Sequence, residues 1–123
     1  MTKRFDSRCL AFLLALALGL VTGCEDDDDF DHHPPAGQGA MIVNNDTFHD
    51  VSVFIDSRRV EEVRDDRKRA YNLDPGVYRV VLEEQGGGRS FRGDIDILEG
   101  RNTVLDVLPG GSSTRYAVEV FFD

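Results

Sequence analysis

The chain contains little that would crosslink it or carry it across a membrane. Among its 123 residues there is no tryptophan, and its two cysteines, Cys9 and Cys24, precede every segment with a folded pattern. A disulfide-stapled scaffold is therefore excluded, and an apolar core alone must stabilise the folded part. The longest apolar run, residues 10–21, has about twelve residues, whereas a membrane-spanning helix needs roughly 20. This run is too short to be a transmembrane helix.

Basic residues are also scarce. The chain has 14 Lys and Arg against 23 Asp and Glu, a net charge of −9. Residues 1–23 carry three basic residues and one acidic residue, a net +2, so a chain that lost them would carry −11. A surface of this sign repels nucleic acid and anionic lipid headgroups, and we expect no nucleic-acid partner.

The N-terminus has the pattern of a secretory signal. Residues 1–8 are basic, the short apolar run follows, and the segment ends in Val21-Thr22-Gly23-Cys24. This ending resembles the lipobox of bacterial lipoproteins, in which an apolar residue and two small ones precede a cysteine. The resemblance implies cleavage between Gly23 and Cys24, because small residues let the signal peptidase close on the backbone. It also implies that Cys24, the nucleophilic thiol, is acylated and anchors the chain in a membrane.

The resemblance further implies an exported protein in a bacterial cell envelope. We expect the outer membrane or the periplasmic face rather than the inner membrane, although the acidic residues after Cys24 fit more than one sorting rule. The expected membrane contact is the lipid on Cys24.

Residues 24–39 are acidic and rich in proline and glycine, a composition that favours a disordered linker. Next to the aspartate run, His32 and His33 are weak candidate ligands for a divalent cation, but a flexible polyanion has no fixed geometry. A plain spacer is the favoured interpretation, and we expect no metal and no cofactor.

From about residue 40 the chain alternates apolar and polar residues between turn signals, as β-strands do. In Val51–Asp56, for example, Val51, Val53 and Ile55 share one face. The predicted strands are Met41–Asn44, Val51–Asp56, Arg59–Arg64, Lys68–Leu73, Val77–Glu84, Ser90–Leu98, Thr103–Leu108 and Arg115–Phe122.

No segment shows a convincing helical stripe, although residues 58–69 are either an exposed hairpin or a short helix. The sequence therefore predicts three parts: a signal peptide (1–23), a lipidated cysteine with a disordered acidic tether (24–39) and an all-β domain (40–123). For the domain we expect a small antiparallel β-sandwich of seven to eight short strands, because two sheets bury one face of each strand. A small barrel is the alternative.

Part of the domain resembles a known module. The residues concerned are Val53 to Asp56, Val60, Tyr71 to Val80 with its Asp74-Pro75-Gly76 turn, and Gly100 to Val104. They are similar to the PEGA-type and related transthyretin-like or carboxypeptidase-regulatory-like sandwich modules, although Ser57 stands where such modules usually have glycine. The resemblance implies an accessory sandwich at the cell envelope and implies no catalytic residues.

Candidate catalytic groups are few. His49 lies between Asp46 and Asp50 in a predicted loop, where a solvated histidine is the simpler interpretation. Neighbouring carboxylates such as Glu83 and Glu84 point to opposite faces of a strand, so they do not converge on one substrate. The remaining pairs are Glu61 with Glu62 and Asp65 with Asp66.

Three further features bear on binding. Gly86 to Gly88 precede a strand, so we expect a hairpin tip and no phosphate loop. One basic cluster, Arg64 with residues 67–69, is either a contact for an acidic partner or a lipid headgroup, or an exposed turn with internal ion pairs. Phe54, Tyr71 and Phe121 would form an apolar docking patch if the opposite sheet leaves them uncovered.

These observations favour a non-enzymatic, membrane-anchored lipoprotein that presents a β-sandwich to a protein partner or an assembly. The alternative is a module that binds polysaccharide or a small ligand. An enzyme would need a pocket that encloses His49 and at least two carboxylates.

Overall fold

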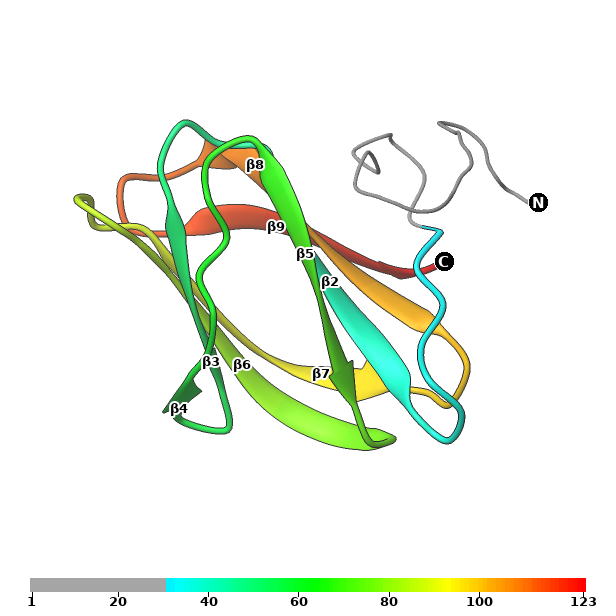
Figure 1. Cartoon of the computed structure of the whole chain (residues 1–123). Helices are drawn as coiled ribbons and strands as arrows, with labels where there is room; N and C mark the ends of the chain where they lie inside the picture. The colour runs from blue at the N-terminus through cyan, green and yellow to red at the C-terminus, as the bar shows by residue number, and fades with distance from the viewer. Residues whose placement is uncertain (1–30) are drawn as a thin grey trace, which may run out of the picture.

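The computed structural model describes residues 31–123, which form two β-sheets packed face to face (Figure 1). The first sheet has the order β5-β2-β8-β9 and the second the order β4-β3-β6-β7. The strands are β2 (Gly39–Asn45), β3 (Val51–Ile55), β4 (Arg58–Arg59), β5 (Arg67–Leu73), β6 (Gly76–Glu84), β7 (Ser90–Ile97), β8 (Asn102–Gly111) and β9 (Tyr116–Phe122). The predicted all-β sandwich is confirmed, and residues 31–123 contain no helix able to cross a membrane.

Two predicted details are wrong. The expected strand Arg59–Arg64 is reduced to β4, which has two residues, and Val63 only bridges to Val51. The fold is also not antiparallel throughout, because β2 and β8 pair in parallel, with Ala40 opposite Asn102. Between β2 and β8 the chain forms the whole second sheet and β5. No local turn joins β2 to β8, so the turns in the sequence do not show the relative direction of these two strands.

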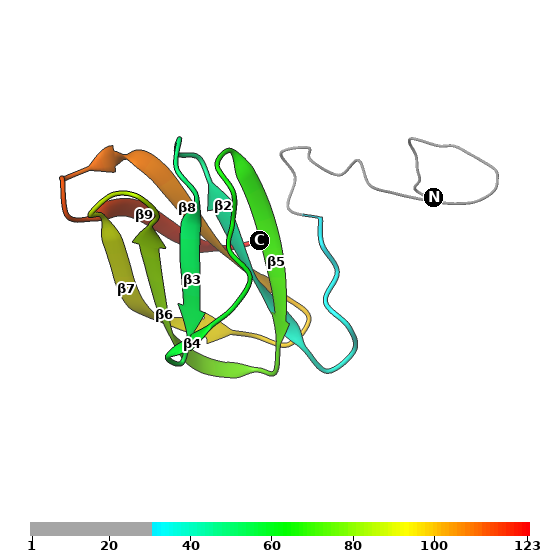
Figure 2. The same ribbon diagram turned by 60° about the vertical axis from the view of Figure 1, so that its left-hand side comes forward.

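The core lies between the two sheets and follows the alternation of the sequence. From the first sheet Met41, Val43 and Leu105 point inward, and each is fully buried. They pack against a set of inward side chains from the second sheet: Val51, Val53, Ile55, Val80, Leu82, Ile95 and Ile97. Figure 2 shows the two layers, with β2 and β5 in one and β3, β6 and β7 in the other.

The sandwich has two ends that differ in composition. The chain enters at Gly39 and leaves at Phe122 at one end, which we call the proximal end. The opposite, distal end carries the β2–β3 loop (46–50), the β6–β7 turn (85–89) and the β8–β9 turn (112–115). Figure 1 shows the C-terminus beside the segment that leads into β2.

Gly39 is required where the chain enters the sheet. A Cβ at this position would collide with the carbonyl oxygen of Leu98 and would lie 2.8 Å from Cγ2 of Ile97. Only a residue without a side chain lets β2 begin this close to the end of β7.

Residues 31–38 do not behave as a free coil, which corrects part of the predicted tether. His32 Nε2 lies 2.7 Å from the Asn72 side-chain oxygen, and the His32 carbonyl accepts a hydrogen bond from the Asn102 side chain. Asn72 on β5 and Asn102 on β8 are the two partners of Ala40 on β2. His32 therefore contacts two strands of the first sheet, one on each side of β2. Gln38 accepts a hydrogen bond from the Gly100 amide. The composition predicted a solvated coil here because composition alone does not show which polar groups of the sheet a segment will contact.

Candidate functional site

The β2–β3 loop at the distal end is held by one buried side chain. Asn45, the last residue of β2, is fully buried, and its amide donates to the carbonyls of His49, Val63 and Arg64 at 2.9–3.2 Å. Its side-chain oxygen accepts from the backbone and the hydroxyl of Thr47. These five hydrogen bonds join the β2–β3 loop to residues 63 and 64, which precede β5.

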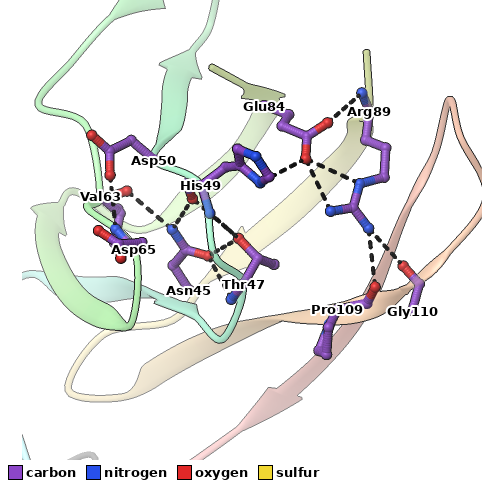
Figure 3. A network of polar contacts seen from close by, with 10 residues as sticks. All are labelled: Asn45, Thr47, His49, Asp50, Val63, Asp65, Glu84, Arg89, Pro109 and Gly110. Carbon is purple, nitrogen blue, oxygen red and sulfur yellow. Dashed lines mark hydrogen bonds and ion pairs between the residues drawn. The ribbon is translucent and has the colours of Figure 1, made fainter. Parts of the chain in front are cut away.

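Glu84 and Arg89 join the other two turns of this end (Figure 3). Arg89 donates to Glu84 from its backbone amide and its guanidinium, the shortest contact being 2.9 Å, and its remaining nitrogen donates to the carbonyls of Pro109 and Gly110. The Glu84 side chain is only 7% exposed. Hydrogen bonds from Arg89 hold the pKa of the Glu84 carboxyl below its usual range.

His49 and Tyr116 complete this group. His49 Nδ1 lies 3.3 Å from the same Glu84 oxygen, and the Arg89 guanidinium lies 5.2 Å from the centre of the Tyr116 ring. Burial raises the pKa of Tyr116 to about 12, and its hydroxyl has no hydrogen-bond partner. Glu84 therefore links the β2–β3 loop to the β6–β7 turn, and Arg89 links that turn to the end of β8.

This arrangement holds the loops of the distal end together. Both carboxylate oxygens of Glu84 accept hydrogen bonds from Arg89, so they are not positioned to remove a proton from a substrate. The nearby hydroxyl of Thr47 is engaged with Asn45 and His49. The predicted solvated state of His49 is only half correct, because its side chain is 52% exposed yet contacts a carboxylate 35 positions away.

The hydrogen-bonded β2–β3 loop carries one highly exposed aromatic side chain. Phe48 lies between Thr47 and His49 and is 86% exposed, the largest exposure among the large hydrophobic residues of the part described. Both neighbours of Phe48 are fixed by the hydrogen bonds around Asn45. A rigid loop loses little conformational entropy when such an aromatic docks onto a partner.

A shallow groove lies beside this end, at the β7 edge of the second sheet. It has a volume of about 570 Å³ and runs between β6, β7 and the β8–β9 turn. The lining residues combine two arginines, one carboxylate and two hydroxyls with apolar and aromatic groups: Val81, Glu83, Ser90, Phe91, Arg92, Thr114, Arg115 and Tyr116. Such a surface has the groups that bind a polar ligand, but it does not contain His49.

The other candidates from the sequence lie apart from each other. Phe54 is on the outer face of the second sheet under Arg59, Phe121 is on the outer face of the first sheet, and Tyr71 packs against the core. The predicted docking patch of these three residues is therefore wrong. Sequence alternation placed them on strand faces but did not show which sheet each strand joins.

The remaining predictions have mixed outcomes. Glu83 and Glu84 do point to opposite sides of β6, with Glu83 exposed, and Gly86 to Gly88 form the β6–β7 turn. Basic residues 67–69 lie on the edge strand β5, where Arg69 donates to the Glu62 carbonyl. Within residues 31–123 no three His, Cys, Asp or Glu side chains converge, and His32 contacts Asn72 instead. Gly23 and Cys24 lie outside the described residues.

The sequence signal for this site was weak. Phe48 lies between two predicted strands and has no apolar neighbour in the sequence, and Asn45 directly follows a predicted strand. An asparagine at the end of a strand followed two residues later by threonine is the local pattern of an Asx-type turn, and this pattern alone marked the loop as ordered.

Comparison with known proteins gives a likeness in structure but none in sequence. No protein-family model matches the chain, and no curated protein sequence matches it. Among solved structures, the NMR structure of a protein from Eubacterium rectale is similar, with 18% sequence identity and a TM-score of 0.47. The superposition covers 80% of this chain and 93% of that one.

Proposed function

We propose that the chain is a bacterial envelope lipoprotein, anchored through acylated Cys24, whose sandwich displays its distal end to a protein partner and catalyses no reaction. The Val21 to Cys24 sequence supports the anchor, and the outer membrane or the periplasmic face is the proposed location. A PEGA-like accessory role is consistent with this proposal.

The observation that carries the partner proposal is Phe48 on its hydrogen-bonded loop. An aromatic side chain that is 86% exposed costs solvation free energy in the isolated protein, and docking recovers it. The Asn45 hydrogen bonds and the Glu84–Arg89 link keep the surrounding loops fixed, so the surface is already formed before a partner arrives.

Site-specific photo-crosslinking in the native host tests this proposal. A photoreactive residue at position 48 should give a discrete crosslinked protein band, whereas the same residue at Val77 should not. Val77 is a matched control because it is 64% exposed but lies at the proximal end of β6. Equal crosslinking at both positions, or none at position 48, would contradict the proposal.

The anchor has its own test. Replacing Cys24 with serine should leave the precursor unprocessed or release the protein from membranes. Normal processing together with unchanged membrane retention would count against acylation.

The groove beside β7 favours a second candidate, a module that binds a polysaccharide or another small ligand. Arg92 and Arg115 at its rim suit a ligand that carries carboxylates, such as an acidic sugar chain. Replacing both arginines with glutamine should abolish binding of an acidic oligosaccharide in a titration, while Phe48→Ala should not affect it.

A further inference from the structure

Large hydrophobic side chains are exposed mostly at one corner of the proximal end. Six such residues are exposed in the part of the chain that the structure describes, and four of them belong to β9 and the adjacent β7–β8 turn. We call these four the apolar corner: Leu98, Val120, Phe121 and Phe122, with exposed fractions of 39–48%. Several exposed apolar side chains at one end of a domain are more informative than a single exposed residue, because such a group marks a surface that contacts something.

The corner exists because β9 is an edge strand. Val120 and Phe122 point to the same side as the core residues Tyr116 and Val118, but the second sheet leaves them half exposed. Phe121 points to the opposite side, so both faces at the end of the strand are apolar. Edge strands of soluble proteins are normally protected by charge, proline or a covering segment.

The chain that leads to Cys24 leaves the sandwich beside this corner. The Asn102 side chain donates to the His32 carbonyl at 2.8 Å, and the Asn102 carbonyl accepts from the Asp123 amide, the residue after β9. One residue of β8 therefore contacts both the N-terminal segment and the end of β9. From Asp31 to Cys24 there are seven residues, which extend to at most about 25 Å.

We propose that the apolar corner docks on the lipid bilayer that holds the acylated Cys24, so that the domain lies against the membrane with its distal end facing away. This inference rests on the proposed lipid anchor. Because segment 31–38 is hydrogen-bonded to the sandwich, only the seven residues from Cys24 to Phe30 separate the lipid from the domain. Because this linker is short, the lipid anchor keeps the apolar corner at a high local concentration near the headgroups.

Charge at the corner favours zwitterionic headgroups. The Arg101 guanidinium lies 5.9 Å from the centre of the Phe122 ring, where it is placed to contact lipid phosphate. Glu99, Glu119 and Asp123 in the β7–β8 turn and at the end of the chain are exposed, and they would be repelled by a strongly anionic surface. Aromatic rings beside a cation are typical of groups that settle at the bilayer interface.

A second copy of the chain fits the corner less well. The antiparallel register that places Phe121 opposite Phe121 of another copy also places Glu119 opposite Asp123. Like charges directly across a strand pair are destabilising. The bilayer imposes no such pairing.

Fluorescence quenching in vesicles tests the proposal with the mature lipidated protein. Acylation of Cys24 and loss of Cys9 leave no free thiol, so a cysteine introduced at Leu98 or at Phe48 can be labelled uniquely. The labelled proteins are reconstituted in phosphatidylcholine vesicles with or without a doxyl-labelled lipid as quencher. Both positions lie outside the strands, and Phe48→Cys at the distal end is the matched control for Leu98→Cys.

We expect doxyl lipid to reduce the emission at position 98 at least about twofold and to leave position 48 unchanged. Adding Val120→Ser and Phe122→Ser to Leu98→Cys should restore the emission, while circular dichroism confirms that this variant is folded. Should it not fold, the comparison of positions 98 and 48 still decides the matter.

Flotation of the vesicles separates the failures. Protein that floats with the vesicles but is unquenched at position 98 would overturn the docking and leave the anchor intact. Protein that does not float would overturn both. Disulfide-linked dimers of a Val120→Cys variant, with no quenching at position 98, would assign the corner to a second copy and also overturn the docking.

Discussion

The two ends of this sandwich differ in their connecting segments and in the side chains that they expose. At the distal end three connecting segments lie outside the sheets, and buried or mostly buried polar side chains fix them: Asn45 in one loop, Glu84 and Arg89 between the others. At the proximal end the connections are short, and apolar side chains at the end of β9 and in the β7–β8 turn are about half exposed. One core therefore supports two different surfaces, hydrogen-bonded loops at the distal end and exposed apolar side chains at the proximal end.

The strongest way to break the distal end is Asn45→Ala. It removes five hydrogen bonds and leaves a space at a fully buried position, so we expect a loss of about 3 kcal/mol in the free energy of unfolding. Urea denaturation measures it. Asn44→Ala is the control, because Asn44 is less buried and mainly donates to Asp106, and it should lose about 0.5 kcal/mol. Equal losses in the two variants would contradict the role given to Asn45.

At the proximal end the most sensitive position is Gly39. The added Cβ of Gly39→Ala meets the Leu98 backbone, so we expect a loss of about 2 kcal/mol in urea denaturation. Gly110→Ala serves as the comparison, because its Cβ would meet only Ala117 at an ordinary distance of 4.0 Å. A Gly39→Ala variant as stable as Gly110→Ala would show that the entry of β2 is not tightly packed.

The Glu84–Arg89 pair predicts a pH dependence confined to the distal end. Because the folded pKa of Glu84 lies below its unfolded value of about 4.3, the pair contributes stability above that value and loses it as the pH falls through the folded pKa. Glu84→Gln should therefore be less stable than the parent protein at pH 7, and the difference should shrink toward pH 3. Thermal unfolding at several pH values measures it, and a difference that is constant with pH would contradict the assignment.

The smallest effect concerns two buried tyrosines. The Tyr116 hydroxyl is buried without a partner, so Tyr116→Phe should be neutral or stabilising by up to about 1 kcal/mol. Tyr71 donates to the Glu61 carbonyl, and Tyr71→Phe should lose about 1 kcal/mol. Urea denaturation at pH 7 should show a loss of stability for Tyr71→Phe and none for Tyr116→Phe, and a loss of about 1 kcal/mol in both variants would contradict this account.

The stability at alkaline pH tests the burial of Tyr116 separately. Because burial raises the pKa of Tyr116 to about 12, its contribution is present below the unfolded value of about 10 and is lost as the pH rises from there. Tyr116→Phe should therefore weaken the loss of stability between pH 10 and pH 12. An unchanged alkaline loss would show that other groups cause it.

Local patterns in the sequence predicted most of the fold. Alternation in Val51 to Ile55 and the Asp74-Pro75-Gly76 turn placed strands and turns correctly, because both depend on neighbouring residues. The parallel pairing of β2 with β8 was missed because it joins segments about 60 positions apart. The same limit hid the contact of His49 with Glu84 and the attachment of His32 to the first sheet. Phe48 needed the structure, because only the packing around Asn45 shows that its loop is rigid.

Mass spectrometry of the N-terminal peptide of the mature protein, purified from membranes, tests the central claim most directly. The account predicts that the peptide begins at Cys24 and carries a thioether-linked diacylglyceryl group. A peptide that begins elsewhere, or one with an unmodified Cys24 thiol in protein from the soluble fraction, would contradict it.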